Sequence, residues 1–287
     1  MASMRDIKRR KESIQSTGQI TKAMKLVATV KLQKAKARAE DSGPYFKEML
    51  RAVRAVLKKS TNLMHPYLQA NPDGKKAIIV ITSNRGLAGG YNSNVTKLVT
   101  GSDMKKEDIV IYAVGRKGRD TLSRKGYTIA ADYSEAINEP LFSDAAQIGK
   151  QVLSDFAEGK IGEIYLAYTE FKNTVSHIPT LVRLLPVAVE DNGEDTTATD
   201  NLTPMNYEPE AEEALSMIIP KYVNSLIYGG LMQAVASENG ARMQAMDSAT
   251  SNADDMISDL SLKYNRARQS SITQELTEII AGANAIS

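Results

Sequence analysis

Apolar positions at the start of the chain recur at helical spacing. Residues 4–58 predict a long helix, because Arg5 to Arg38 contains no proline and one glycine. The Gly43-Pro44 pair predicts a kink or an interruption in it. The seam of this helix repeats every seven residues, at Ile7, Ile14, Thr21 and Ala28. Such a narrow stripe is typical of a coiled coil rather than of a broad globular core face.

The end of the chain predicts a second and longer helix, from about residue 210, in which Pro220 marks a start or a kink. If continuous, it is about 115 Å long at 1.5 Å per residue, so it needs a partner. Its apolar and small positions alternate spacings of three and four, at Met243, Met246, Thr250, Ala253, Ile257, Leu260, Tyr264, Ala267, Ser271, Gln274, Glu278, Ala281 and Ala285. The last of these are mostly small and bury little area, so we expect a surface outside the pair to enclose the tip.

The region between the helices has a different pattern. Lys76–Thr82 and Asp108–Gly115 are nearly continuous apolar runs, as in strands buried on both faces. Further strands are predicted at 127–132, 163–171 and 175–187, and helices at 92–99, 119–124 and 144–158. This alternation predicts a Rossmann-like α/β domain of about five strands, mainly parallel with an antiparallel edge.

We therefore expect four regions. Residues 1–59 form an N-terminal coiled-coil helix, 75–189 the α/β domain, 190–209 an acidic linker and 210–287 a C-terminal coiled-coil helix. The two terminal helices are expected to pair antiparallel. No apolar run approaches the roughly 20 residues of a membrane-spanning helix.

Charge is unevenly distributed along the chain. The net charge is +2, yet residues 1–59 carry +11 and residues 190–213 carry −9. A basic arm favours an acidic partner, which leaves nucleic acid, anionic lipid and an acidic protein surface open. Nucleic acid lacks support because no interleaved aromatic residues or recognition motif are present. Lipid lacks bulky apolar anchors.

Candidate chemistry is sparse. The turn Ser83–Asn92 is rich in glycine and joins a strand to a helix, where α/β folds bind phosphates. Its spacing matches neither dinucleotide nor Walker-type phosphate loops, so we favour a turn that needs glycine for close packing. The two histidines, His65 and His177, are far apart in sequence, and there is no cysteine. We expect no catalytic residue, no cofactor and no metal site in this chain.

Three motifs resemble one family. The C-terminal run Ile272–Ala283, with Tyr264–Gln269 and Ala241–Met246 before it, resembles the terminal motif of the gamma subunit of F-type ATP synthases. Gln19–Met24 and Arg85–Asn92 match the same family in order along the chain. The resemblance covers essentially the whole sequence.

The resemblance implies a rotor shaft without catalysis of its own. The helix pair is expected inside a ring of three alpha and three beta subunits, with the α/β domain on the epsilon subunit and the c-ring. Proton flow turns the c-ring, and the shaft drives the catalytic beta sites through their conformations. The complex implies a peripheral location at the cytoplasmic face of the cell membrane, contact with the membrane only through the complex, and no nucleic acid.

Contact residues follow from the same resemblance. The positions that match its beta-subunit contacts are Met24, Lys25, Arg242, Arg268, Gln269, Thr273 and Glu275. Tyr207 and Glu208 match the foot that faces the c-ring and epsilon. The family usually has Glu where Lys25 stands, so we hypothesise a tighter contact with an acidic lever of beta. Asn239-Gly240 replaces a helix-favouring pair, and we expect the helix to be softer there.

Two other functions compete with the rotor. One is a nucleotide-binding enzyme with helical extensions, for which the glycine-rich turn is the relevant feature. The other is a coiled-coil protein that binds nucleic acid or acts as a scaffold, for which the basic arm is the relevant feature. Binding of ATP or NAD to the isolated chain distinguishes the first, and co-purifying partners distinguish the second.

Overall fold

The computed structural model describes residues 4–59, 65–187 and 211–286. The chain divides into two compact units, Met1–Thr29 with Arg242–Ser287, and Val30–Ala241. Each unit is described by itself. Within the described residues, no helix is long and apolar enough to span a membrane.

Two long helices account for both ends of the chain. Helix α1 is Met4–Lys59 and helix α5 is Ala211–Ile286. The expected interruption at Gly43-Pro44 does not occur, because α1 continues through it. Pro220 likewise lies inside α5, where the fully buried Ile219 and Val223 anchor the helix on both sides of the proline. A proline weakens a helix interior but does not force its end when packing holds the flanks.

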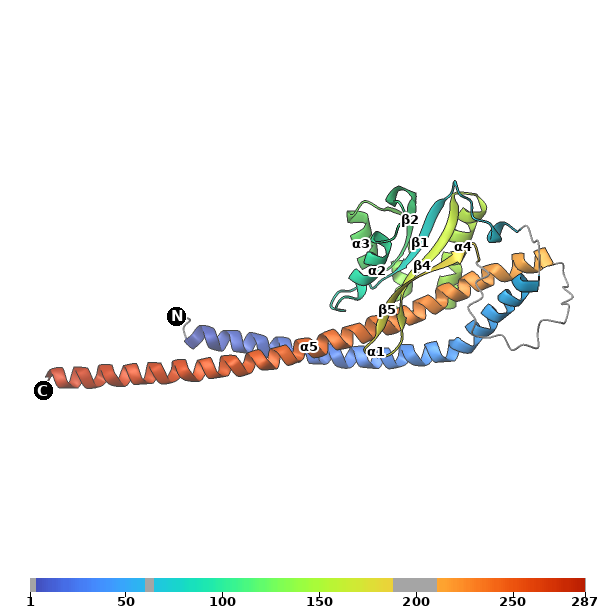
Figure 1. Ribbon diagram of the computed structural model, residues 1–287. Helices are drawn as coiled ribbons and strands as arrows, with labels where there is room; N and C mark the ends of the chain where they lie inside the picture. Colours follow the sequence, from blue (N-terminus) through green and yellow to red (C-terminus); the bar gives the residue numbers. More distant parts are fainter. Residues whose placement is uncertain (1–3, 60–64, 188–210, 287) are drawn as a thin grey trace. The chain divides into compact units, whose positions relative to one another are not determined.

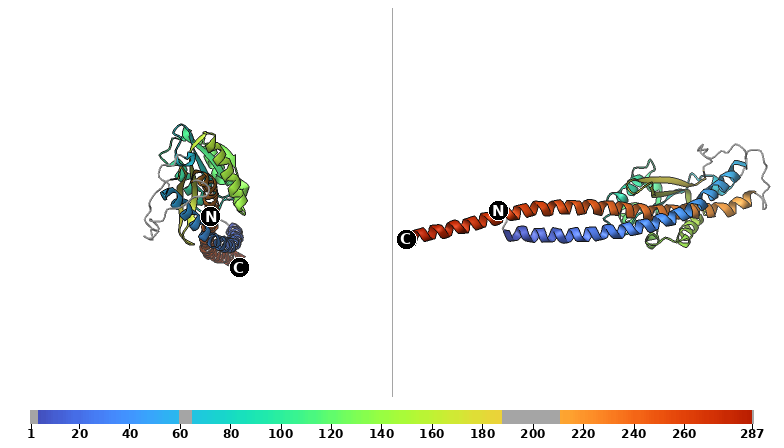
Figure 2. Two further views of the ribbon diagram at one scale, coloured as in Figure 1. Left: turned by 90° about the vertical axis from the view of Figure 1, so that its right-hand side faces the viewer. Right: turned by 90° about the horizontal axis from the view of Figure 1, so that it is seen from below.

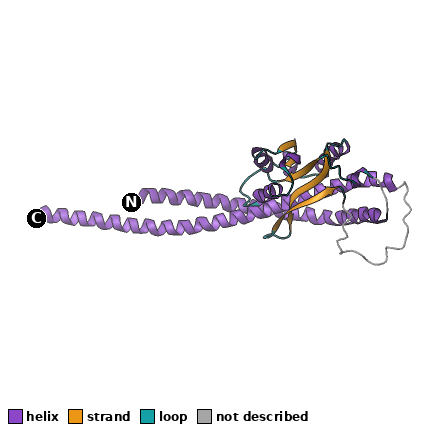
Figure 3. Ribbon diagram, turned by 45° about the horizontal axis from the view of Figure 1, so that its top comes forward, coloured by secondary structure: helices purple, strands orange, loops and turns teal. Residues whose placement is uncertain are grey.

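The sheet in the unit Val30–Ala241 has five strands in the order β3-β2-β1-β4-β5. The strands are β1 (Lys75–Ile81), β2 (Ile109–Val114), β3 (Thr128–Asp132), β4 (Ile161–Phe171) and β5 (His177–Leu185). All neighbours pair parallel except β4 and β5, which form an antiparallel hairpin. The predicted mixed sheet with one antiparallel edge is confirmed (Figure 3).

Both faces of the sheet are covered, which explains why its central strands are apolar throughout. Ile78 and Val80 of β1 face α2 (Tyr91–Thr100) and α3 (Arg116–Arg124), where Val95 and Leu122 are fully buried. The alternate residues of β1 face α4 (Phe142–Ala157) and the first part of α5 (Figure 1). The buried residues that α5 adds to this core are Leu215, Ile219, Tyr222, Val223, Ile227, Leu231 and Ala234.

Two helices start earlier than the apolar pattern predicts. Helix α3 begins at Arg116 rather than near 119, because its first N–H groups find acceptors in Asn84, Ser83 and Thr82. Helix α4 begins at Phe142, because Asp144 accepts a hydrogen bond from the N–H of Leu141 at 2.9 Å. Short 3-10 turns at Pro66–Leu68, Lys106–Asp108 and Ser134–Ile137 complete the connections.

Candidate functional site

The two long helices pair antiparallel in the unit formed by Met1–Thr29 and Arg242–Ser287. The hydroxyls of Thr21 and Thr250 lie 2.8 Å apart, and Lys25 Nζ lies 2.6 Å from Asp247 Oδ1. Gly18 faces Ala253 so closely that a Cβ on the glycine would lie 3.3 Å from the alanine Cβ. As the residue number rises along α1, the number of the contacting residue on α5 falls, as expected for antiparallel helices.

Small and large side chains together fill this seam. Thr21 and Ala28 of α1 are buried, as are Met246, Ala253 and Leu260 of α5. Every predicted seam position of α5 from Met243 to Ser271 is buried or half-buried. Small residues let the two backbones approach closely, while Met246 and Leu260 add large buried apolar side chains.

The seam ends before the helix does. Gln274, Glu278 and Ala281, which the pattern placed in the seam, are exposed. Met4 stands fourteen residues before Gly18, and Ala267 stands fourteen residues after Ala253, so α1 begins about opposite Ala267. The prediction of a seam to the end was wrong here, because the described part of α1 begins at Met4 and its residues do not cover the last turns of α5.

The free end of α5 carries large apolar side chains. All residues from 272 to 284 are exposed, and α5 projects past the start of α1 (Figure 2). Ile272, Leu276, Ile279 and Ile280 are 49%, 54%, 68% and 59% exposed. Four such side chains on one stretch of helix form an exposed apolar surface that another protein could cover.

The predicted contact residues fall into two groups in this unit. Met24, Lys25 and Arg242 are half-buried, whereas Arg268, Gln269, Thr273 and Glu275 are exposed. Arg268 follows Asp247 by 21 residues, which is about 32 Å along the helix axis. Thr273 donates to the carbonyl of Gln269 at 2.9 Å, so its hydroxyl is held along the helix. Tyr207 and Glu208 lie outside the described residues.

Sequence reasoning missed the partner of Lys25. Asp247 follows the seam residue Met246, and positions that flank a seam commonly carry charges that pair between helices. Lys25 therefore already has an acidic partner in its own chain. The pair is partly exposed, with side chains 39% and 62% accessible.

The glycine-rich turn is occupied by the chain's own polar groups. Asn92 Oδ1 accepts from the N–H of Ser83 at 2.9 Å, and Asn92 Nδ2 donates to Ser83 Oγ at 2.7 Å. Thr82 Oγ1 accepts from the N–H of Gly118 at 2.9 Å. These bonds use groups that would otherwise meet a phosphate, which argues against a nucleotide at this edge of the sheet.

Gly115 shows why the neighbouring turn needs glycine. Its φ is +113°, and a Cβ there would lie 2.0 Å from the carbonyl oxygen of Thr82. A side chain at this position is excluded by both the backbone conformation and the contact. Close packing accounts for this glycine without a ligand.

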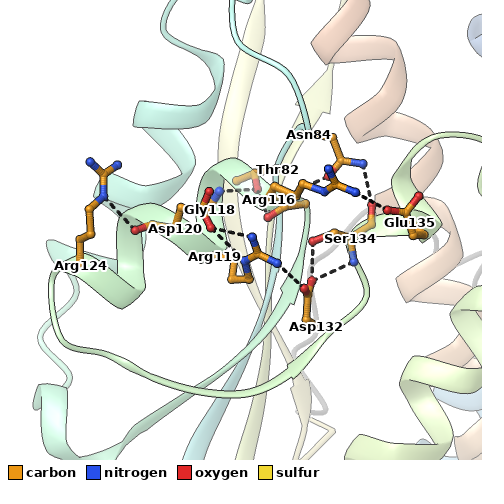
Figure 4. Close-up of polar contacts among 11 residues, drawn as sticks. Thr82, Asn84, Arg116, Gly118, Arg119, Asp120, Arg124, Asp132, Ser134 and Glu135 are labelled. Carbon is orange, nitrogen blue, oxygen red and sulfur yellow. Dashed lines mark hydrogen bonds and ion pairs between the residues drawn. The ribbon is translucent and has the colours of Figure 1, made fainter.

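Charges along the same edge pair with one another (Figure 4). Arg119 contacts Asp120 and Asp132, and Arg116 Nη2 lies 2.6 Å from Glu135 Oε1. Burial alone would raise the pKa of Asp132, but hydrogen bonds from Ser134 and Arg119 outweigh it and hold that pKa below its usual value. Arg116, Arg119, Asp132 and Glu135 line a hollow of about 420 Å³. Because both arginines pair with carboxylates of the chain, the hollow does not favour binding of an anion.

The histidines have separate environments. His65 Nε2 lies 2.8 Å from Ser216 Oγ, and His65 Nδ1 accepts from the N–H of Tyr67. His177 packs against Phe171, with ring centroids 5.8 Å apart. Over the part of the chain that the structure describes, no three His, Asp or Glu side chains gather in a way that could hold a metal ion.

Known sequences match the chain over its full length. A family model described as ATP synthase matches residues 3–286. An ATP synthase gamma chain of Lachnoclostridium phytofermentans is 71% identical, covering 100% of both chains. One of Alkaliphilus metalliredigens is 43% identical, covering 99% of this chain and 98% of the relative. One of Acetobacterium woodii, described as sodium ion specific, is 41% identical and covers 99% of each.

Solved structures share the architecture. A chain in the central stalk and c-ring structure of the Tetrahymena thermophila mitochondrial ATP synthase has a TM-score of 0.59 at 28% identity. That match covers 80% of this chain and 99% of the other. A chain of the Euglena gracilis mitochondrial ATP synthase has a TM-score of 0.69, covering 99% and 94%. At 18% identity, the second likeness concerns the fold alone.

Proposed function

The chain belongs to the family of ATP synthase gamma chains, and from this membership we propose that it is the central rotor shaft of an F-type ATP synthase. In this role it couples rotation of the ion-driven c-ring to the conformational cycle of the catalytic beta subunits. It performs no catalysis itself and needs no cofactor. The observation that carries the proposal is 71% identity to a gamma chain over the full length of both proteins.

The proposed partners are those of such a complex. They are three alpha and three beta subunits around the helix pair, with the epsilon subunit and the c-ring at the α/β domain. We expect no nucleic acid, and membrane contact only through the complex. The corresponding location is the cytoplasmic face of the cell membrane. The coupling ion in this proposal is the proton, and sodium is the alternative because the Acetobacterium woodii relative is described as sodium specific.

The four regions expected from the sequence acquire roles in this proposal. Regions 1–59 and 210–287 form the shaft, 75–189 forms the foot and 190–209 connects foot to shaft. The first part of α5 has two roles, because its buried residues also complete the core beneath the sheet. Tyr207 and Glu208 are proposed to face the c-ring and epsilon.

The exposed end of α5 supports the enclosed position. Its four large apolar side chains lack a partner among the described residues of the chain and suit an apolar sleeve formed by the alpha and beta subunits. Arg268, Gln269, Thr273 and Glu275 supply polar groups for contact with beta on the same stretch. Met24, Lys25 and Arg242 form the second proposed contact, where the basic α1 meets an acidic part of beta.

Co-purification tests the proposal. The complex is extracted from native membranes through an affinity tag on this chain, and the stoichiometry of its subunits is measured by mass spectrometry. We expect three alpha and three beta subunits for each copy of this chain, together with epsilon and the c-ring. Recovery of the chain alone, or with RNA that nuclease removes, would contradict the rotor and favour a scaffold.

A further inference from the structure

The hairpin of β4 and β5 touches α5 at a glycine. A Cβ on Gly240 would lie 2.6 Å from Cε1 and 3.1 Å from Nε2 of His177, and 3.6 Å from Cε2 of Phe171. The imidazole therefore occupies the space that any larger residue at position 240 would fill. Gly240 is buried, and Asn239 beside it donates from Nδ2 to the carbonyl of Val235 at 2.8 Å. Close packing thus explains a glycine that helix propensity disfavours.

His177 enters this contact as a neutral ring. Both of its ring nitrogens are buried, and among the described residues neither has a partner that meets hydrogen-bond geometry. Burial lowers the pKa of His177, and the backbone of Thr174 opposes this effect only in part. An imidazolium here would lose its hydration, and the backbone of Thr174 compensates for that loss only in part. The ring serves as an apolar side chain wedged between Phe171 and the helix.

Two further contacts join α5 to strand β4. Ser237 Oγ donates to the carbonyl of Thr169 at 3.1 Å, and both residues are buried. A Cβ on Gly230 would lie 2.9 Å from Cδ2 of Leu166. From residue 230 to residue 240, side chains of β4 and β5 thus fit into glycine positions on α5. The last of these contacts lies one residue before the end of the unit Val30–Ala241, and α5 continues through that point as one helix.

We propose that the β4–β5 hairpin clasps α5 at Gly240, and that His177 and Gly240 are positioning residues for the transfer of rotation from the sheet to the shaft. The proposal rests on the rotor function above. A helix that contacts a sheet only through apolar side chains that do not interlock can rotate about its own axis when the sheet turns. Side chains inserted into glycine positions oppose rolling, because close-packed groups cannot pass one another without separation of the helix from the sheet.

The clasp itself is tested in the full chain without reference to ATP synthase. The chain has two histidines, so their Cε1–H signals can be followed by NMR against pH and assigned with His65→Gln. We expect His177 of the parent to titrate with a pKa below its ordinary value of 6.5. Gly240→Ala should expel the ring and return its titration toward that value. A parent His177 that titrates near 6.5 would overturn the clasp.

The role in rotation is tested in the assembled complex. The measurement is the number of ions transported per ATP hydrolysed in reconstituted vesicles. We expect His177→Ala, which empties the contact without adding a clash, and Gly240→Ala to lose transport while hydrolysis continues. Gly86→Ala is the matched control, because its Cβ would meet only Lys117 Cε, at 3.9 Å.

The possible results separate the two proposals. Parent-like transport in both variants, with His177 shown by NMR to be displaced in Gly240→Ala, would overturn the positioning role and leave the rotor function intact. If the parent chain does not assemble with alpha and beta subunits, the rotor function itself fails. The NMR titration of His177 tests the contact with Gly240 whether or not either of these two proposals fails.

Discussion

The hydroxyl oxygens of Thr21 and Thr250 lie 2.8 Å apart across the seam between α1 and α5. Each hydroxyl also lies within hydrogen-bond distance of a carbonyl in its own helix, Gly18 for Thr21 and Met246 for Thr250. A hydroxyl has one proton, so at any moment only one of the two can donate across the seam. The contact fixes the register of the helices because a shift by one residue would separate the hydroxyls.

The first prediction concerns this pair. Thr21→Val should lower the free energy of unfolding by about 1 kcal/mol, because it removes the bond across the seam. The double variant Thr21→Val/Thr250→Val should recover most of the loss, since two apolar groups of the same shape replace two hydroxyls. Urea unfolding of the full chain measures both. A double variant that loses as much stability as Thr21→Val and Thr250→Val lose together, or more, would mean that the hydroxyls do not act as a pair.

The second prediction concerns Lys25 and Asp247. The pair is partly exposed, so Asp247→Asn should cost at most about 1 kcal/mol, and less in high salt. Lys25→Glu places two carboxylates together and should change ATP-driven rotation of the complex. The exchange Lys25→Glu/Asp247→Lys restores the pair within the chain while reversing the charge at position 25.

The exchange distinguishes two origins of a Lys25→Glu effect. If rotation-coupled hydrolysis returns to the parent rate, the pair inside the chain matters. If it remains altered, Lys25 acts on an acidic group of beta, as its family position suggests. Identical rates in Lys25→Glu and the parent would remove the hypothesis of a tighter contact with beta.

The periodic features of the fold could be predicted from the sequence. The seven-residue seam and the apolar runs of β1 and β2 depend on local spacing, which determines which face is buried. Spacing does not identify the partner that covers a face. The apolar residues of α5 between Leu215 and Ala234 therefore resembled more of a helical shaft, whereas they pack beneath the sheet. The end of the seam was missed because it depends on where α1 begins.

The candidate contacts depended on family motifs more than on physical reasoning. Arg268 and Gln269 are exposed polar residues on a helix, and nothing in local spacing distinguishes them from a solvated face. Sequence reasoning rejected a metal site at His177 but missed its contact with Gly240, because that contact joins residues 63 positions apart. The glycine at 240 was the available signal, since a buried glycine in a helix interior indicates a close approach.

The third prediction compares two apolar residues of α5. Ile227→Ala should destabilise the isolated chain by about 2–5 kcal/mol, because Ile227 is fully buried beneath the sheet. Leu276→Ala should change stability by less than about 0.5 kcal/mol, because Leu276 is 54% exposed. Thermal unfolding of the full chain measures both effects.

In the assembled complex, we expect Leu276→Ala to have an effect that it does not have in the isolated chain. Leu276→Ala should weaken retention of the shaft in the ring of alpha and beta subunits, measured as dissociation of the chain on dilution. Exposed Lys263 on the same helix gives a matched control in Lys263→Ala. Equal retention in Leu276→Ala and the control would show that the apolar end is not enclosed.

The fourth prediction is a dependence of stability on pH that comes from His177. Its pKa is lowered in the folded chain, so the unfolded chain binds the proton more readily. The stability that the neutral ring contributes is complete above the ordinary pKa of 6.5 and is lost progressively as the pH falls below it. Urea unfolding at pH values of about 7.5 and about 5.5 spans the start of this window. His177→Phe keeps an aromatic ring that cannot be charged, and the carboxylates affect both proteins alike. The parent should lose more stability than His177→Phe between the two pH values, and equal losses would show that His177 is not held neutral against Gly240.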